Sequence, residues 1–100
     1  MAIGRTNAQG ARAKVALSGT VNVTLQNNTE YRLTGVTSLT VSYPTGSFEC
    51  WIYLTTGSSI TVTFPSRTTY LGAAPEFAKN TSYEISIKDG VVAAAEVVSA

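Results

Sequence analysis

The chain lacks histidine altogether and has a single cysteine among its 100 residues. Without histidine it has neither the usual general base nor the common zinc ligand and nucleophile activator. One cysteine cannot form an intramolecular disulfide bond, and Cys50 lies within the apolar run FECWIYL, which favours a buried free thiol over a reactive one. No apolar run is long enough to span a membrane and no signal-peptide pattern is present, so we expect synthesis in the cytoplasm.

Acidic residues are also scarce, and they are spread along the chain. Glycoside hydrolysis requires two carboxylates across a cleft, but the six acidic residues show no obvious pairing. Asp89 precedes Gly90 and is explained as a turn residue, whereas Glu84 occupies a solvent-facing strand position. No Asp-rich loop or cysteine cluster indicates a metal site. We therefore predict a non-enzymatic protein with neither a cofactor nor a metal ion.

Positive charge is concentrated at the start of the sequence. The net charge is only +1, yet Arg5, Arg12 and Lys14 all precede the first acidic residue. From residue 15 onward four basic residues face six acidic ones, which gives 4 − 6 = −2. A nucleic-acid-binding face is therefore not expected. Residues 1–16 have no strong hydrophobic period, so we interpret them as a flexible lead-in or linker and residues 17–100 as one β-domain.

What the sequence does have is abundant threonine and serine, and this Thr-rich, charge-poor composition favours sheets over helices. Short alternating segments separated by turn signals such as TG, PTGS and TTGSS predict strands. The segments are 20–26, 31–36, 38–44, 48–54, 60–65 and a terminal hairpin at 83–98. No internal repeat is evident. The pattern predicts an all-β fold, a single small sandwich or barrel of about seven antiparallel strands.

The segment 48–54 is apolar on both faces. One face carries Trp51 and Tyr53 beside Glu49, and the other is formed by Phe48, Cys50, Ile52 and Leu54. Flat aromatic rings can stack on sugars, but nothing nearby supplies a convergent set of carboxamides or acids. We therefore prefer a role for Trp51 and Tyr53 in the core or in an interface to a role as a sugar platform. Tyr70 is likewise interpreted first as a packed or interfacial side chain.

The terminal hairpin presents a related problem. The dipeptide Asp-Gly at 89–90, between two β-rich runs, is typical of a two-residue type I′ turn. That loop would place Ala93 and Ala95 on the face opposite to Ile85, whereas a bulged three-residue loop would exchange the two faces. In either register the last strand presents small apolar side chains on both faces. We therefore expect a partner to cover the face that the core leaves free.

Two segments carry a recognisable order of motifs. They are residues 60–98, ITVTFPSRTTYLGAAPEFAKNTSYEISIKDGVVAAAEVV, and, less specifically, residues 17–44, LSGTVNVTLQNNTEYRLTGVTSLTVSYP. The order is a TVTFP strand, a YLG..P.F loop that contains Tyr70 and Phe77, then YEISIKDG and a short apolar strand. These segments resemble the C-terminal β-domain of virion appendage proteins, tail-fibre-like proteins in particular, from phages and prophages of gut Gram-positive bacteria. The resemblance implies a virion protein, often trimeric, that contacts other virion proteins, is exposed at the particle surface and can contact the host envelope.

Two functions are compatible with these features. The preferred one is a structural module of a phage virion, a homotrimer in which other copies cover the apolar strand faces. The alternative is a monomeric carbohydrate-binding or host-adhesion module, in which Trp51, Tyr53 or the loop 67–80 contacts a glycan. The candidate binding or interface residues are Trp51, Tyr53, Tyr70, Phe77, Ala93 and Ala95. The oligomeric state distinguishes the two functions.

Overall fold

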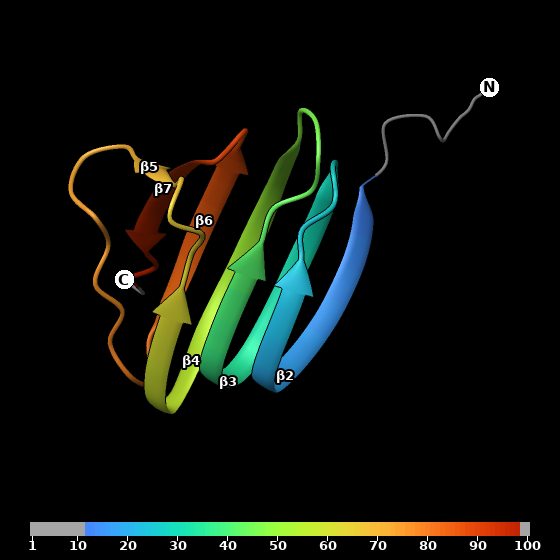
Figure 1. The fold of residues 1–100 in the computed structure, drawn as a ribbon. Helices are drawn as coiled ribbons and strands as arrows, with labels where there is room; N and C mark the ends of the chain where they lie inside the picture. The colour runs from blue at the N-terminus through green and yellow to red at the C-terminus, as the bar shows by residue number, and fades with distance from the viewer. Residues whose placement is uncertain (1–11, 99–100) are drawn as a thin grey trace.

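The structure, a computed structural model, describes residues 12–98, and these form a single six-stranded β-sheet (Figure 1). The strands are β2 (Ala13–Thr24), β3 (Thr29–Ser42), β4 (Glu49–Thr63), β5 (Thr69–Tyr70), β6 (Ser82–Lys88) and β7 (Val91–Glu96). Their order across the sheet is β2-β3-β4-β6-β7-β5, and the described residues include no helix. The predicted all-β class is confirmed, whereas the predicted sandwich or barrel of about seven antiparallel strands is wrong.

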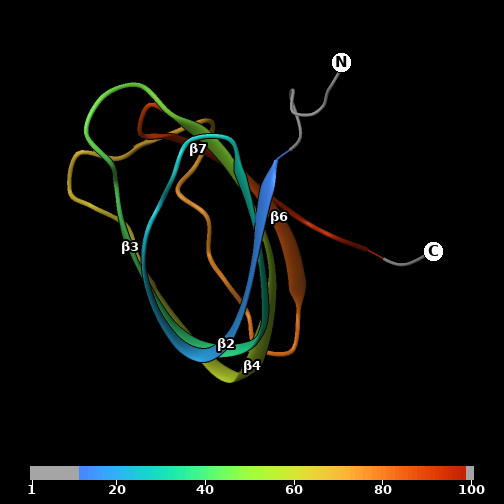
Figure 2. The ribbon, with the colours of Figure 1, turned by 90° about the vertical axis from the view of Figure 1, so that its right-hand side faces the viewer.

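The first three strands are long and bent, and they stack like the coils of a flattened solenoid (Figure 2). β2, β3 and β4 contain 12, 14 and 15 residues, and each bends back on itself. β2 pairs in parallel with β3, and β3 pairs in parallel with β4. Parallel neighbours need a connection that returns the chain to its starting edge. Here the second half of each bent strand supplies most of that connection, so no crossover helix is required.

Glycine lies at the bend of each coil. Gly19 and Gly35 have φ values of 73° and 60°, a left-handed conformation that glycine adopts without steric cost, and the pairing register shifts beside both. At Gly57 a glycine is favoured because there is little space for a side chain. A Cβ atom there would lie 3.1 Å from Thr37 Cγ2 and 3.2 Å from the Gly35 carbonyl oxygen. The bends therefore disfavour a side chain, either by conformation or by contact between coils.

These bends explain the errors in the predicted strand boundaries. Segments 31–36 and 38–44, predicted as two strands, fall almost entirely within β3, and most of 48–54 and 60–65 falls within β4. A glycine at positive φ can end a strand or only bend it, and sequence alone does not distinguish the two outcomes. β2 begins at Ala13, so residues 13–16, expected to be linker, pair with β3. Of the rest of that expected linker, Arg12 directly precedes β2, and residues 1–11 lie outside the described residues.

Equivalent residues of successive coils lie side by side. The register places Leu17 beside Leu33, and Leu33 beside Leu54. Each leucine precedes the glycine of its bend by two or three positions, as Leu-x-Gly or Leu-x-x-Gly. This spacing is an internal repeat, although the sequence alone predicted none. Stacking of equivalent side chains in successive coils gives the interior continuous apolar rows.

The hydrophobic core lies inside the coils and continues beneath the hairpin. Its buried members are Val21, Leu25, Tyr31, Leu33, Val36, Leu39, Val41, Phe48, Cys50, Ile52, Leu54, Tyr83, Ile85, Ile87 and Val92. Cys50 is a buried free thiol, as predicted, and its burial, together with the charge of Glu49, raises the pKa of the thiol to about 12. The thiolate is the reactive form of cysteine, and the raised pKa keeps the buried Cys50 thiol protonated at neutral pH. Cys50 therefore has a structural role.

The terminal hairpin adopts the two-residue turn. Asp89 and Gly90 have φ values of 51° and 82°, and Lys88 pairs with Val91, as a type I′ turn requires. This register buries Ile85, Ile87 and Val92 and leaves Ala93 and Ala95 on the opposite face. Of the two registers compatible with the sequence, the structure therefore has the one that turns Ala93 and Ala95 away from the core.

Candidate association and binding face

Four of the predicted site residues meet on the surface of the sheet that faces away from the core. Strand pairing aligns Trp51 with Ser86 and Ala93, and Tyr53 with Glu84 and Ala95. Because side chains alternate along a strand, these residues all lie opposite to the buried positions of β4, β6 and β7. We call this surface, from β2 to β7, the outer face. The aromatic pair and the alanine pair thus share one surface, with β6 between them.

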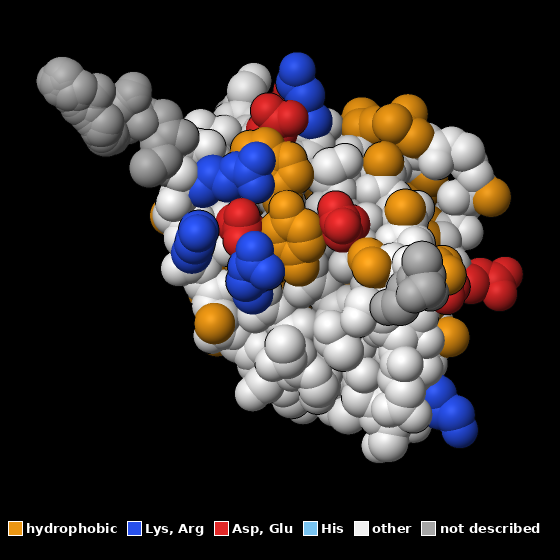
Figure 3. Space-filling model, turned by 180° about the vertical axis from the view of Figure 1, so that it is seen from behind, with side chains coloured by type: hydrophobic (Ala, Val, Ile, Leu, Met, Phe, Trp, Pro, Cys, Tyr) orange, Lys and Arg blue, Asp and Glu red, His pale blue; other side chains and the backbone are white. Residues whose placement is uncertain are grey.

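The outer face is hollowed beside its aromatic residues. A hollow of about 290 Å³ is lined by Trp51, Tyr53, Glu84, Ile85, Ser86, Ala93, Ala94 and Ala95. A second hollow, of about 370 Å³, shares Ser86 and Ala93 and extends to Leu71 and Val91. Small side chains on β7 beside bulky ones on β4 produce this shape, and we call the two hollows together the trough. Figure 3 shows apolar side chains gathered on this side of the molecule next to a cluster of basic ones.

Two arginines stack on the aromatic rings beside the trough. The Arg12 guanidinium carbon lies 3.7 Å from the centroid of the Trp51 ring, and that of Arg32 lies 4.7 Å from the centroid of the Tyr53 ring. Both distances are within the range of cation–π interactions. Arg32 is paired with Tyr53 across β3 and β4, whereas Arg12 precedes β2 and reaches over β3. One face of each ring is therefore occupied by a guanidinium group.

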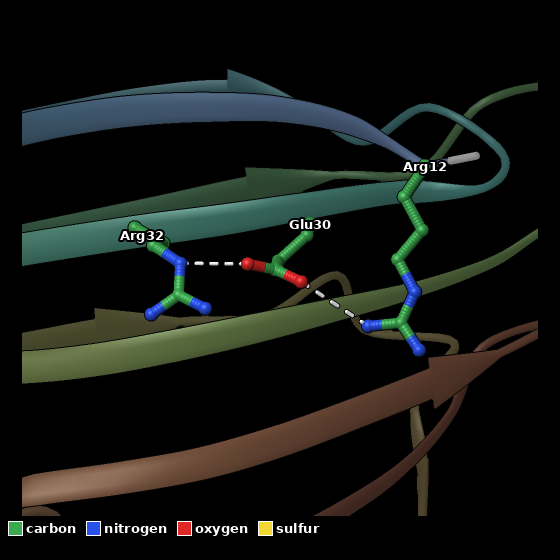
Figure 4. A network of polar contacts seen from close by, with 3 residues as sticks. All are labelled: Arg12, Glu30 and Arg32. Carbon is green, nitrogen blue, oxygen red and sulfur yellow. Dashed lines mark hydrogen bonds and ion pairs between the residues drawn. The ribbon is translucent and has the colours of Figure 1, made fainter.

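Glu30 holds the two arginines in place (Figure 4). Its Oε1 accepts a hydrogen bond from Arg12 Nη1 at 3.2 Å, and its Oε2 accepts one from Arg32 Nε at 2.6 Å. The Glu30 side chain is only 7% exposed. Burial raises the pKa of its carboxyl group, but the hydrogen bond and charge of Arg32 and the charges of Lys14 and Arg12 outweigh burial, and the pKa is lowered. Glu30 therefore stays ionised at neutral pH and binds both guanidinium groups.

Sequence patterns did not predict this network. Arg12 falls within the expected linker, and Glu30 had no assigned partner. The available signal was that the pair Glu30-x-Arg32 is matched, one strand later, by the equally spaced pair Trp51-x-Tyr53. That match has meaning only when β3 and β4 pair in parallel, and a sandwich of antiparallel strands would not bring these residues together.

The other two predicted site residues, Tyr70 and Phe77, lie elsewhere. Both are partly buried and pack against the core. The Tyr70 ring meets Phe64 edge-on at a centroid distance of 6.1 Å, and the Phe77 ring meets Tyr83 edge-on at 4.8 Å. The structure therefore does not bring Tyr70 or Phe77 to the trough, and their contacts are those of packed side chains.

Among residues 12–98 there is no group of three or more His, Cys, Asp or Glu side chains placed to hold a metal ion. The same residues contain no helix of the length and apolarity needed to cross a membrane. Comparisons with family models, curated proteins and solved structures gave no match. The outer face offers an aromatic ridge, an alanine floor and a basic rim, which can bury apolar surface and bind opposite charge.

Proposed function

We propose that this chain is a non-enzymatic structural module of a phage virion appendage and that copies of it associate through the outer face. The observation that carries the proposal is the convergence of Trp51, Tyr53, Ala93 and Ala95 on one shallow trough. Contiguous apolar surface on a small domain is typical of an interaction site. The virion context rests on the resemblance of residues 60–98 to appendage domains, which makes a homotrimer and contacts with other virion proteins the expected assembly.

The shape of the trough suits a protein neighbour. Ala93 is half-buried and Ala95 is exposed, so the floor of the trough lets the backbone of another chain approach closely. Leu71, on the far side of Val91 and Ala93, is 65% exposed and can enter a complementary depression. A copy of the same chain offers both the depression and the protruding leucine, which is the self-complementarity that homo-oligomers require.

The charges of the outer face also support association between copies. Arg12, just before β2, Lys14 on β2 and Arg32 on β3 carry three positive charges. Glu30 on β3 carries one negative charge, so the net charge of this side is 3 − 1 = +2. On β4 and β6 the outer face carries one positive charge, on Lys88, and two negative charges, on Glu49 and Glu84, so the net charge of that side is 1 − 2 = −1. A neighbour that places its basic side over the acidic side of the next copy gains favourable electrostatics, which contribute mainly to specificity and association rate.

The test is the mass of the protein in solution. Light scattering of the wild type should give a multiple of the monomer mass, and Ala93→Glu and Ala95→Glu should each lower that mass with unchanged circular dichroism. A carboxylate buried without a partner costs several kcal/mol, roughly, which is enough to dissociate a modest interface. Thr63→Glu, at an exposed position on the second half of β4, is the matched control and should keep the wild-type mass. Wild-type mass in both alanine variants, or a monomeric wild type, would reject the proposal.

A monomeric glycan-binding module is the second candidate. The observation in its favour is that the trough combines the edges of Trp51 and Tyr53 with the polar groups of Glu84 and Ser86. The guanidinium groups over both rings count against it, because a sugar would have to displace them to stack there. If the protein is monomeric and a glycan array is positive, Trp51→Ala should abolish binding in a protein that remains folded, and the glycan function would replace the structural one.

A further inference from the structure

The first coil of the solenoid is built like an inner coil but is less well covered. The register aligns Leu17, Leu33 and Leu54 in one row across the three coils, and Leu33 and Leu54 belong to the core. Leu17 is nevertheless 39% exposed, whereas Leu33 and Leu54 are 0% and 1% exposed. Terminal repeats of solenoid proteins normally present a polar surface. An exposed leucine in this row therefore indicates that this end of the described solenoid is an interaction surface.

The backbone of β2 is open at the same end. The Ala13 N–H donates to the carbonyl oxygen of Asn28, on the side of β3. Successive residues of a strand direct their N–H groups to opposite sides, so the N–H groups of Lys14, Ala16 and Ser18 point away from β3. Within residues 12–98, β2 is the terminal strand of the sheet and pairs only with β3. A strand edge of this kind is a template for the addition of another strand.

The sequence directly before β2 is a poor candidate for that strand. Residues 1–11, MAIGRTNAQGA, contain only two large apolar side chains, Met1 and Ile3. Every coil of the described chain instead contributes large apolar residues to the core, as Val21, Leu33 and Leu54 do. This contrast favours a different chain as the cover for the first coil.

The first half of β2, AKVALS, is complementary to itself in the antiparallel direction. A twofold axis at Ala16 sets Val15 opposite Leu17 of the second copy, on the core side. On the outer side it sets Ala16 opposite Ala16 of the second copy, and Lys14 opposite Ser18 of the second copy. Apolar residues therefore meet apolar ones, and the single charge of this segment does not face its equivalent.

We propose that the edge of β2 docks on the edge of β2 of a second copy of this chain, as an antiparallel strand pair about a twofold axis near Ala16. The pairing satisfies the outward N–H groups, covers Leu17 and joins two six-stranded sheets into one. This isologous contact uses a different surface from the trough. The contact between β2 edges therefore does not depend on association through the outer face.

Cysteine crosslinking tests the contact at single positions. Ala16→Cys should form a disulfide-linked dimer on mild oxidation, because paired residues of neighbouring strands bring their Cα atoms about 5.5 Å apart. Cys50 is buried with a raised pKa and does not compete. Lys14→Cys is the matched control. In the proposed register its two copies are offset by four residues, roughly 13 Å, and should stay monomeric on a non-reducing gel.

A proline variant tests the same contact without oxidation. In the Ala93→Glu background, which removes association through the trough, the protein should remain a dimer and Ala16→Cys should still crosslink. Ala16→Pro in that background removes an N–H that points away from β3, so the mass should fall to that of the monomer with unchanged circular dichroism, since proline is tolerated on the open side of an edge strand. The proposal is wrong if Ala16→Cys remains monomeric, or if it crosslinks only after residues 1–11 are removed, which would assign the edge to the upstream segment.

Discussion

The stacked coils β2–β4 and the hairpin β6–β7 both contain fully buried side chains but reach their registers by different means. Leu33 in a coil and Ile87 in the hairpin are both 0% exposed. The hairpin pairs residues across a two-residue turn, whereas paired residues of neighbouring coils, such as Ala13 and Thr29, are separated by a whole coil of chain. The two-residue turn at 89–90 sets the hairpin register between residues close in sequence, but the coil register depends on side chains that meet only after each strand has bent.

This difference has a consequence for stability. A hairpin register set by its turn should be sensitive to backbone conformation at two positions. A coil should instead be sensitive to how completely its neighbours cover it, because each coil contacts only the next ones in the stack. Substitutions that separate these two sensitivities test the comparison directly.

The largest effect is expected from truncating the stacked leucines. In dilute monomer, Leu33→Ala should lower the free energy of unfolding by about 2–5 kcal/mol, because Leu33 is enclosed by a coil on each side. Leu17→Ala, in the same row but partly in water, should cost roughly 1 kcal/mol. Ile85→Ala in the hairpin should resemble Leu33→Ala. Urea denaturation measures all three, and equal losses at Leu17 and Leu33 in the monomer would contradict the dependence on coverage.

A smaller effect is expected at the hairpin turn. Gly90→Val should destabilise the protein by roughly 1–2 kcal/mol or more, because a β-branched residue is disfavoured at positive φ. Crowding is not the cause, since a Cβ at Gly90 would approach Tyr43 Cε2 only to 3.6 Å. Asp89→Asn should be nearly neutral, because asparagine tolerates left-handed geometry and retains an oxygen that can accept the hydrogen bond from the Phe48 N–H, which Asp89 Oδ1 now accepts at 2.8 Å. Thermal melts that coincide for the two variants would mean that the turn does not set the register.

The smallest effect is expected from the Glu30 network, which ties the coils together and has no counterpart in the hairpin. The pKa of Glu30 is lowered from its ordinary value of 4.5, so its contribution to stability is complete above that value and is lost as the pH falls through the lower, folded-state pKa. Wild-type stability should decrease more between neutral pH and about pH 3 than that of Glu30→Gln. Glu84→Gln, which removes an exposed carboxylate from the same face and leaves the Glu30 network intact, is the control for the change in net charge. Urea denaturation at each pH measures the stability of both proteins. Identical pH profiles of stability for wild type and Glu30→Gln would exclude this coupling.

The candidate site was predictable only in part. Alternation along 48–54 placed Trp51 and Tyr53 opposite Cys50 and the other buried positions, and the turn at 89–90 allowed Ala93 and Ala95 to be placed opposite Ile85. That these two pairs lie on one trough could not be deduced, because it requires β6 to pair with both β4 and β7. The arginines over the aromatic rings were missed for the same reason, since Arg12 and Trp51 are distant in sequence and meet only across a stack of parallel strands.

Local sequence patterns were enough to predict the all-β class, the burial of Cys50 and the two-residue loop as one of two possible hairpin registers, because alternation and turn chemistry act over a few neighbouring residues. They were not enough to show that Gly19, Gly35 and Gly57 bend strands instead of ending them, or that the strands stack in parallel. A glycine permits both outcomes at similar local cost. The choice between them is made by contacts between coils, which are formed by residues a whole coil apart in the chain and are therefore invisible to any local pattern.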